Sequence, residues 1–149
     1  MKDYKNEKNE KNFFIDTNIL VYCYDEKYTE KKKKSENLLI NAVKNKNFIY
    51  LSNQIISEFS YILIKKAKLN PDIIKTNLKK IISPQNIKVL NYTDKTILSA
   101  IEIYKYYNVP FWDSLIIATM LENNIFTIYT ENKKDFTRCK KIEVINPFE

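Results

Sequence analysis

The 149-residue chain contains no glycine and no histidine. Without glycine it cannot form a Walker-type phosphate loop or the G-x-G-x-x-G loop of dinucleotide-binding proteins. Without histidine it cannot use Ser-His-Asp or Cys-His catalysis, or a histidine-ligated zinc site. Any catalysis must therefore rest on carboxylates, lysine, tyrosine, serine, threonine or cysteine. Turns that need a positive φ must use asparagine or aspartate, and Asn108 and the pair Asn123–Asn124 are the candidates.

Cysteine is scarce, and long apolar runs are missing. Cys23 and Cys139 are far apart in the sequence and form no C-x-x-C motif. Two such residues are typical of reduced thiols in a cytoplasmic protein. No apolar run approaches the roughly 20 residues of a membrane span, and the N-terminal residues contain no signal-peptide core. We therefore expect a cytoplasmic protein that does not enter a membrane.

The length suits a single domain with a full hydrophobic core. Residues 1–11 are almost wholly charged and polar, so we expect a disordered leader followed by one domain over residues 12–149. The net charge is +7, from 25 Lys and Arg against 18 Asp and Glu. That excess permits binding to nucleic-acid phosphates. However, abundant lysine, asparagine and isoleucine indicate an A/T-biased genome, so a solvated basic surface is an equal alternative.

Short apolar runs alternate with segments of helical periodicity, which predicts the α/β class. We expect a three-layer α/β/α sandwich around a central parallel sheet of four to five strands. The predicted strands are Phe13–Asp16, Phe48–Leu51, Ile87–Leu90, Phe126–Tyr129 and Ile142–Ile145. The predicted helices are Thr17–Tyr24, Thr29–Lys46, Asn53–Lys66, Pro71–Ser83, Thr93–Tyr107 and Trp112–Glu122, with a loop or short helix over Thr130–Phe136.

Periodicity also predicts which helix faces are buried. The segment Trp112–Glu122 is apolar on nearly every side, so it should be a central helix. The run of lysines at residues 31–34 should be a solvated face, with phosphate contact as the less favoured alternative. The apolar stripe of the helix that carries these lysines is predicted to be Leu38, Leu39, Ala42 and Val43, and the helix that begins at Thr93 is predicted to bury Ile97, Leu98, Ile101 and Tyr104.

Four acidic residues follow strands or open helices in this arrangement. Asp16 ends the first strand, Glu58 lies in the helix after the second, Asp113 opens the most apolar helix, and Asp135 follows the fourth strand. Each also has a purely structural interpretation, as a helix cap, a partner of the helix dipole, a solvent-facing charge or a lysine partner. Because the carboxyl ends of parallel strands meet at one edge of a sheet, we expect all four to converge there.

Converging carboxylates repel one another and are costly to bury unless a cation compensates them. Oxygen ligands favour the hard cations Mg²⁺ and Mn²⁺. Two such ions about 3.5–4 Å apart can activate water and stabilise the leaving oxygen in an in-line displacement. The cluster therefore predicts metal-dependent phosphodiester hydrolysis that needs no histidine.

Four segments carry a resemblance to a known family: F-I-D-T-N-I-L, then S-E-F, then F-W-D-S-L-I-I-A-T-M, then I-Y-T-E-N-K-K-D-F. In this order and at these separations they resemble a PIN-domain ribonuclease, and most of all the VapC-type toxins of toxin–antitoxin pairs. The resemblance covers residues 12–149. It implies that Asp16, Glu58 and Asp113 bind metal. It further implies that Thr17 and Asn18 steady Asp16 and that Thr130 contacts the site in the same way.

The fourth acid departs from the family pattern. Many relatives carry T-x-D-x-x-D/H-F, whereas position 132 of this chain is asparagine. Asp135 therefore becomes the candidate fourth acid, with Asn132 as a neutral ligand or hydrogen-bond donor. Losing one charge could weaken the second metal, so a site with one ion and a site with two both stay open.

The resemblance also implies cleavage of single-stranded RNA to a 5′-phosphate and a 3′-hydroxyl, a homodimer, and often an antitoxin whose tail lies across the active-site groove. Two alternatives are kept. The first is a non-catalytic or weakly catalytic PIN-type module that binds nucleic acid through lysine and tyrosine. The second is a phosphotransfer domain with Asp16 as acceptor, which Asn18 disfavours because it breaks the D-x-D spacing of haloacid-dehalogenase-like phosphatases.

Overall fold

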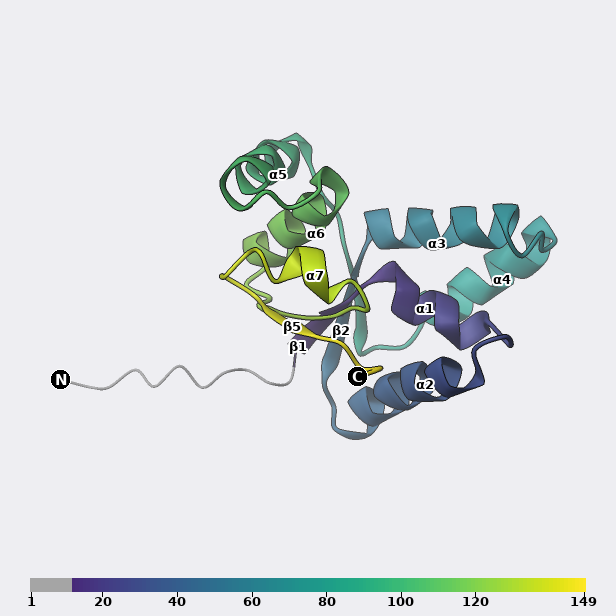
Figure 1. The fold of residues 1–149 in the computed structure, drawn as a ribbon. Coiled ribbons are helices and arrows are strands. Elements are labelled where there is room, and N and C mark those ends of the chain that lie inside the picture. The colour runs from purple at the N-terminus through teal and green to yellow at the C-terminus, as the bar shows by residue number, and fades with distance from the viewer. Residues whose placement is uncertain (1–11) are drawn as a thin grey trace.

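The structure is a computed structural model that describes residues 12–149, so the predicted leader lies outside the described residues. Residues 12–149 form five strands and seven helices (Figure 1), whose ends lie within three residues of the predicted ones. The strands are β1 (Asn12–Ile15), β2 (Phe48–Ser52), β3 (Ile87–Leu90), β4 (Thr127–Tyr129) and β5 (Glu143–Ile145). The helices are α1 (Thr17–Tyr24), α2 (Thr29–Lys44), α3 (Asn53–Lys65), α4 (Pro71–Ile82), α5 (Asp94–Tyr107), α6 (Phe111–Glu122) and α7 (Lys133–Phe136).

The five strands form one parallel sheet in the order β3-β2-β1-β4-β5. The central strand β1 pairs with β2 on one side and with β4 on the other, so that Phe14 lies opposite both Tyr50 and Ile128. The predicted α/β/α sandwich with a parallel sheet is confirmed.

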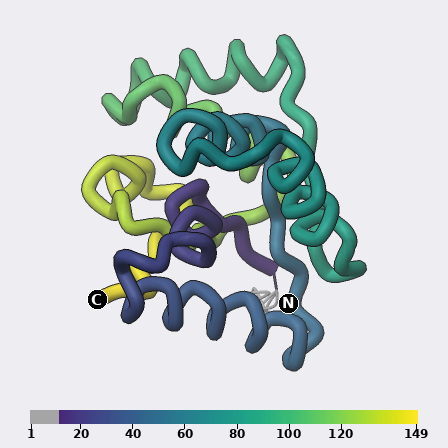
Figure 2. The backbone as a smooth tube through the Cα atoms, turned by 90° about the vertical axis from the view of Figure 1, so that its right-hand side faces the viewer, coloured from purple at the N-terminus to yellow at the C-terminus, as the bar shows by residue number. Residues whose placement is uncertain are grey.

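Helices cover both faces of the sheet. Helices α1 to α4 lie on one face and α5 to α7 on the other (Figures 1 and 2). From β1 the chain moves outward to β2 and β3, and it then returns across the sheet to β4 and β5. The direction of winding therefore reverses between β1 and β4, and the crevice at that switch point is where ligands bind in open α/β sheets.

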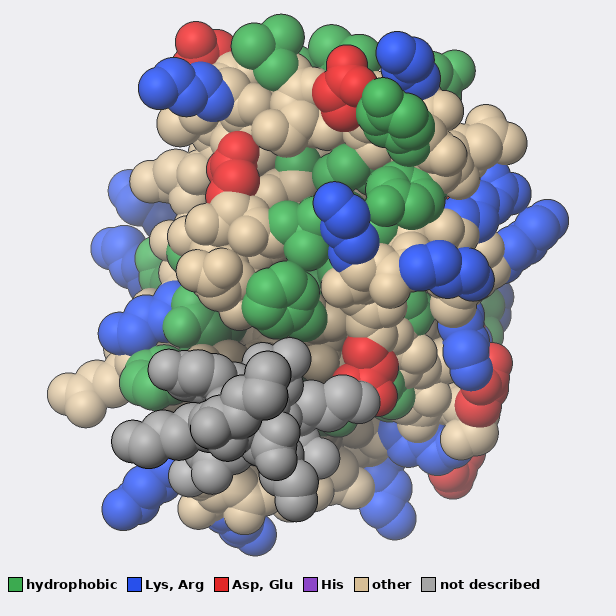
Figure 3. All heavy atoms as spheres, turned by 90° about the vertical axis from the view of Figure 1, so that its left-hand side faces the viewer, with side chains coloured by type: hydrophobic (Ala, Val, Ile, Leu, Met, Phe, Trp, Pro, Cys, Tyr) green, Lys and Arg blue, Asp and Glu red, His purple; other side chains and the backbone are tan. Residues whose placement is uncertain are grey.

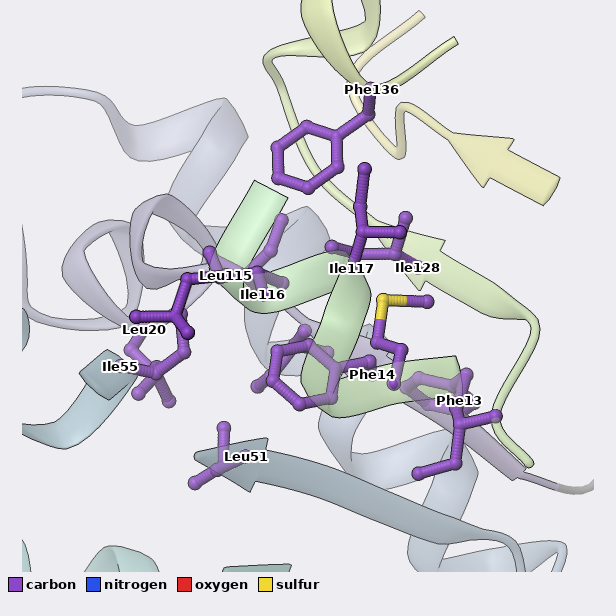
Figure 4. Packing of buried hydrophobic residues seen from close by; sticks show 14 of the residues in the cluster. Phe13, Phe14, Leu20, Leu51, Ile55, Leu115, Ile116, Ile117, Ile128 and Phe136 are labelled. Atoms are coloured by element: carbon purple, nitrogen blue, oxygen red, sulfur yellow. The ribbon is translucent and has the colours of Figure 1, made fainter. Parts of the chain in front are cut away.

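The core lies between the central strands and α6. Residues 13–15 of β1 are buried, and so are the seven consecutive residues 114–120 of α6, which confirms the predicted central helix. Figure 4 shows labelled side chains from β1, β2, β4, α1, α3, α6 and α7 packed around Phe14 and Ile117. A helix buried on all sides fixes the position of its own first turn, which carries Asp113.

The absence of glycine is visible at the helix ends. As predicted, Asn108 and Asn124 adopt a positive φ, of 53° and 55°, whereas Asn123 does not. Lys46 and Lys68 also adopt a positive φ, of 56° and 49°, which was not predicted. Lysine has no side-chain group that favours this conformation, so the turns after α2 and α3 impose it. A residue with positive φ cannot continue a right-handed helix, so α2 ends at Lys44, two residues before the predicted end at Lys46.

The predicted buried face of α5 was wrong. Ile97, Leu98, Ile101 and Tyr104 are exposed, Leu98 by 65%. The helix buries Thr96, Ala100 and Ile103 instead, a row with the same 3–4 spacing but smaller side chains. This row packs against α6, where small residues allow a close approach. Val43 of α2 is likewise exposed, although the rest of its predicted stripe is buried or half-buried.

Figure 3 views the molecule from the left-hand side of Figure 1 and shows exposed hydrophobic side chains between scattered lysine and arginine side chains. The positive charges that Figure 3 shows on this face do not form one continuous patch. From residue 12 onward, no helix combines the length and apolar character that crossing a bilayer requires.

Replacing Lys46 or Lys68 by glycine should stabilise the protein. Glycine removes the steric cost of the positive φ, so each substitution should raise the free energy of unfolding by about 0.5–1 kcal/mol in urea titrations. The matched control is Lys33→Gly, at an exposed position inside α2, which should lower the free energy of unfolding by about 1 kcal/mol. If all three substitutions destabilise the protein equally, the turn conformations at Lys46 and Lys68 are wrong.

Candidate active site

Asp16 is buried directly after the central strand β1, at the switch point of the sheet. Its backbone N–H donates to the carbonyl of Tyr129 at 3.0 Å, which continues the pairing of β1 with β4. Its Oδ1 accepts from the N–H of Thr17 at 2.7 Å, so Asp16 does cap α1. Its Oδ2 accepts from Thr130 Oγ1 at 2.7 Å and from Asn18 Nδ2 at 3.3 Å. The cap and the site thus use different oxygens of one carboxylate.

The segment after β4 is held next to Asp16 by side-chain hydrogen bonds. Asn18 Oδ1 accepts from the N–H of Glu131 at 3.3 Å, and Thr130 Oγ1 accepts from the N–H of Asn132 at 3.0 Å. The predicted supporting residues Asn18 and Thr130 therefore both lie against Asp16 and also bind the loop that follows β4.

Glu58 reaches this place from α3. Its Oε2 accepts from Thr17 Oγ1 at 2.8 Å, so the third predicted supporting residue contacts Glu58 by its side chain and Asp16 by its backbone. Its Oε1 accepts from Gln54 Nε2 at 2.9 Å. The same nitrogen of Gln54 donates to the carbonyl of Trp112 at 3.0 Å, beside Asp113. Sequence reasoning missed Gln54, although its position four residues before Glu58 places it on the same face of the helix.

Asp113 and Asp135 meet through Asn132. The Nδ2 of Asn132 donates to Asp113 Oδ2 at 3.0 Å and to Asp135 Oδ2 at 3.1 Å. The other oxygen of Asp135 is ion-paired with Arg138, at 3.3 Å between Nη2 and Oδ1. Hydrogen bonds therefore link Asp16 to Glu58 through Thr17, and Asp113 to Asp135 through Asn132. The structure brings the four predicted acids to one edge of the sheet.

The site carries more negative charge than neighbouring side chains neutralise. Burial, followed by repulsion from Asp16, Asp135 and Glu58, raises the pKa of Asp113 to about 7. Burial also raises the pKa of Asp16, against the hydrogen bonds that it accepts from Thr130 and Thr17. Among residues 12–149, no lysine or arginine is ion-paired with Asp16, Glu58 or Asp113. Three of the four acids thus lack a protein cation.

A groove of about 670 Å³ opens onto this cluster. Asp16, Glu58, Asp113 and Asn132 lie along it, together with side chains from α1 and α3, whereas Asp135 does not line it. A second hollow of about 530 Å³ lies over β2 and β3 and is lined mainly by apolar residues of α1, α2 and α4. It contains none of the four acids, so the groove is the part of the surface where chemistry by the carboxylates can occur.

The donor set fits a hard divalent cation in its chemistry. Carboxylate oxygens are the preferred ligands of Mg²⁺ and Mn²⁺, and these three carboxylates carry charge that no described side chain neutralises. As they stand, no three acidic or cysteine side chains within residues 12–149 form a group that could hold a metal ion. Binding an ion therefore requires the carboxylates to turn toward one point in the groove.

A further group of residues, missed by sequence reasoning, holds the loop after β4 from the other side. Lys31 forms an ion pair with Glu131, and Tyr22 OH donates to Glu131 Oε2 at 2.5 Å. Burial acts to raise the pKa of Glu131, but the hydrogen bonds from Lys31 and Tyr22 outweigh it and lower the pKa. The first lysine of the 31–34 run thus folds onto the protein, whereas Lys33 and Lys34 are exposed as predicted.

Comparison with known proteins identifies the fold. The family model of the PIN domain matches residues 13–142. The structure of FitAB bound to an IR36 DNA fragment is similar over 92% of this chain and 96% of that one, at a TM-score of 0.70 and 16% identity. The structure of VapBC2 from Rickettsia felis, bound to a DNA fragment from its promoter, is similar over 91% of this chain and 98% of that one. Its TM-score is 0.68 and its sequence identity 20%.

VapC20 from Mycobacterium tuberculosis, a toxin that cleaves the sarcin–ricin loop, is similar over 84% of this chain and 92% of that one. Its TM-score is 0.66 and its identity 15%. No curated protein sequence matches the chain. At these identities the solved structures establish a shared fold.

The raised pKa of Asp113 predicts a pH-dependent stability in the absence of metal. The folded protein binds the proton of Asp113 more tightly than the unfolded chain does. The stability that this protonation contributes is present below about pH 3.8 and is lost as the pH rises through about 7. With a discount for the partial solvent exposure of Asp113, the free energy of unfolding of Asp113→Asn should exceed that of the wild type by about 2 kcal/mol at about pH 8, and by little near pH 4. The exposed Asp72→Asn is the control. A difference that does not change with pH would contradict the crowding of carboxylates around Asp113.

Proposed function

Because the chain belongs to the PIN-domain family, we propose that it is a divalent-metal-dependent endoribonuclease that hydrolyses phosphodiester bonds in single-stranded RNA. We propose in addition that it acts as the toxin of a toxin–antitoxin pair. The observation that carries the proposal is the placement of Asp16, Glu58 and Asp113 along one groove without a protein cation. Carboxylates so arranged favour a bound Mg²⁺ or Mn²⁺.

Asp16, Glu58 and Asp113 would hold the ion, and Asp135 would be the fourth acid of the site. The bound ion supplies a Lewis acid that activates water and offsets charge on the phosphate. Thr130 and Asn18 orient Asp16 by donating to its Oδ2, and Thr17 and Gln54 do the same for Glu58. These hydrogen bonds keep the carboxylates beside the groove, where they would turn toward the bound ion.

In the proposed reaction the oxygen of a water molecule bonds to phosphorus and the bond from phosphorus to the 3′-oxygen breaks. The water gives up one proton to a carboxylate or to solvent, and the leaving 3′-oxygen takes up one proton. The products are a 5′-phosphate and a 3′-hydroxyl.

The alternative is a module that binds nucleic acid and cleaves it weakly or not at all. One observation favours it: Asn132 contributes an N–H donor between Asp113 and Asp135 where many relatives have an acid. Tyr22, Tyr24 and Tyr28 line the same groove and offer aromatic faces for bases. This alternative predicts salt-sensitive RNA binding without cleavage under any metal.

A partner antitoxin is supported by the solved relatives, several of which are toxin–antitoxin complexes. The acidic groove suits a basic segment of such a partner, since a positive side chain could neutralise the uncompensated carboxylates in place of a metal. A homodimer is also proposed. Leu98, Ile101 and Tyr104 lie exposed on the outer face of α5, and a second copy of this chain would bury them.

The ribonuclease proposal predicts cleavage of single-stranded RNA with Mg²⁺ or Mn²⁺ and no cleavage with EDTA. Asp16→Asn removes a buried ligand charge that Thr17, Asn18 and Thr130 hold in place, so the cleavage rate should fall at least about a hundredfold. The control Asp72→Asn, on the exposed first turn of α4, should cleave at the wild-type rate. Gel analysis of an end-labelled RNA measures both.

Single-stranded DNA of the same sequence tests the substrate class. RNA cleavage that survives both EDTA and Asp16→Asn would refute the metal mechanism. Binding without cleavage, weakened by salt and unchanged in Asp113→Asn, would establish the alternative module.

The dimer proposal predicts that a charge in the middle of the exposed α5 face keeps the chain monomeric. Leu98→Glu should halve the mass measured by light scattering after size-exclusion chromatography, because a carboxylate is costly to bury against apolar side chains. Ser99→Glu, which changes the net charge equally at an exposed position of the same helix away from this face, is the control. A wild type that is monomeric at high concentration would rule out this interface.

A further inference from the structure

Asp135 differs from the other three acids in being ion-paired with a cationic side chain among residues 12–149. Its Oδ1 is paired with Arg138 and its Oδ2 accepts from Asn132. It lies on α7, three residues before its ionic partner, and it does not line the groove. A cation that approached Asp135 would have to displace a guanidinium that is already bound there.

Arg138 is the single arginine of a chain that otherwise uses lysine. Its Nη1 donates to the carbonyl of Asn108 at 2.5 Å, while its Nη2 faces Asp135. Two nitrogens of one planar group thus serve two acceptors at once, which a lysine ammonium on a single flexible stem does less well. The guanidinium also stays charged at every accessible pH, so this compensation does not depend on protonation.

The second contact of Arg138 connects it to the position of Asp113. Asn108 is the residue of positive φ that ends α5, and its carbonyl lies at the negative end of that helix dipole. Three residues later α6 begins, and Ser114 Oγ donates back to the carbonyl of Val109 at 3.0 Å. Arg138 therefore fastens α7 to the connection that leads into the helix carrying Asp113.

Asn132 completes this arrangement. Its amide nitrogen faces Asp113 and Asp135 and donates to both. A pair of N–H donors stabilises two neighbouring anions, whereas a cation needs acceptors at the same point. The amide of Asn132 thus places partial positive charge between Asp113 and Asp135, and the guanidinium of Arg138 places full positive charge at the other oxygen of Asp135.

We propose that Arg138 serves as the fixed cation of the fourth acidic position, so that Asp135 is not a metal ligand and the site holds one divalent ion per chain. The inference rests on the proposed function and narrows it: the ion lies with Asp16, Glu58 and Asp113, and Arg138 takes the place of a second ion. Arg138 is in this account a positioning residue, which acts through Asp135 and Asn132.

A Mn²⁺ titration of the full-length protein tests the inference without an activity assay. The electron paramagnetic resonance signal of free Mn²⁺ reports how much metal stays unbound at each step. We expect one tightly bound Mn²⁺ per wild-type chain. Asp135→Asn should keep that stoichiometry and weaken binding by less than about threefold, whereas Asp16→Asn should weaken it by at least about tenfold.

Arg138→Gln should release Asp135 and add a second, weaker Mn²⁺ per chain. Arg138→Lys keeps a positive charge at this position and should bind one Mn²⁺ per chain. Lys141→Gln removes one exposed charge elsewhere and should also bind one Mn²⁺ per chain. Circular dichroism establishes that each variant is folded. If Arg138→Gln does not fold, the comparison of Asp135→Asn with the wild type still decides the question.

Two tightly bound Mn²⁺ per wild-type chain, or a loss of affinity in Asp135→Asn as large as in Asp16→Asn, would overturn the inference. If such a protein also cleaves RNA with added metal, the proposed function stands and only the role of Arg138 is wrong. A wild type that binds no Mn²⁺ and cleaves no RNA would refute the proposed function, and the inference with it.

Discussion

The parallel pairing of β1 with β4 is the constraint on which the rest of the site depends. It places Asp16 and Thr130, which are 114 residues apart in the sequence, within hydrogen-bond distance at the point where the sheet changes its direction of winding. The helix that follows β1 leaves toward one face and the segment that follows β4 leaves toward the other. The groove between them is a consequence of the strand order.

Into this groove the fold directs more negative charge than its own cations neutralise. Hydroxyl and amide groups of Thr17, Asn18, Gln54, Thr130 and Asn132 hold the carboxylates in place, but these groups are neutral. Neutral donors orient a carboxylate without neutralising its charge. Burial and repulsion among the uncompensated carboxylates therefore raise the pKa of Asp113. The site therefore carries charge that a cation would compensate, and Asp135 is the one of the four acids that is ion-paired with a side chain of residues 12–149.

Much of this arrangement could be predicted from the sequence, because the relevant signals are local. An apolar run that ends in an acid indicated Asp16, and the positions of Glu58 and Asp113 in the first turns of apolar helices indicated the other two. Contacts between distant segments could not be predicted. The pairing of Arg138 with both Asp135 and Asn108 depends on how α7 docks beside α5. The face of α5 was mispredicted because two helical registers fit its sequence, and packing against α6 selects the row of smaller side chains.

The central claim, that the carboxyl edge of the sheet holds a divalent cation between Asp16, Glu58 and Asp113, is tested most directly by anomalous diffraction. Crystals of the wild-type protein grown with Mn²⁺ should show a strong anomalous peak in the groove, within coordination distance of these three side chains. Peaks found only elsewhere, with the three carboxylates unchanged and no peak in the groove, would contradict the account.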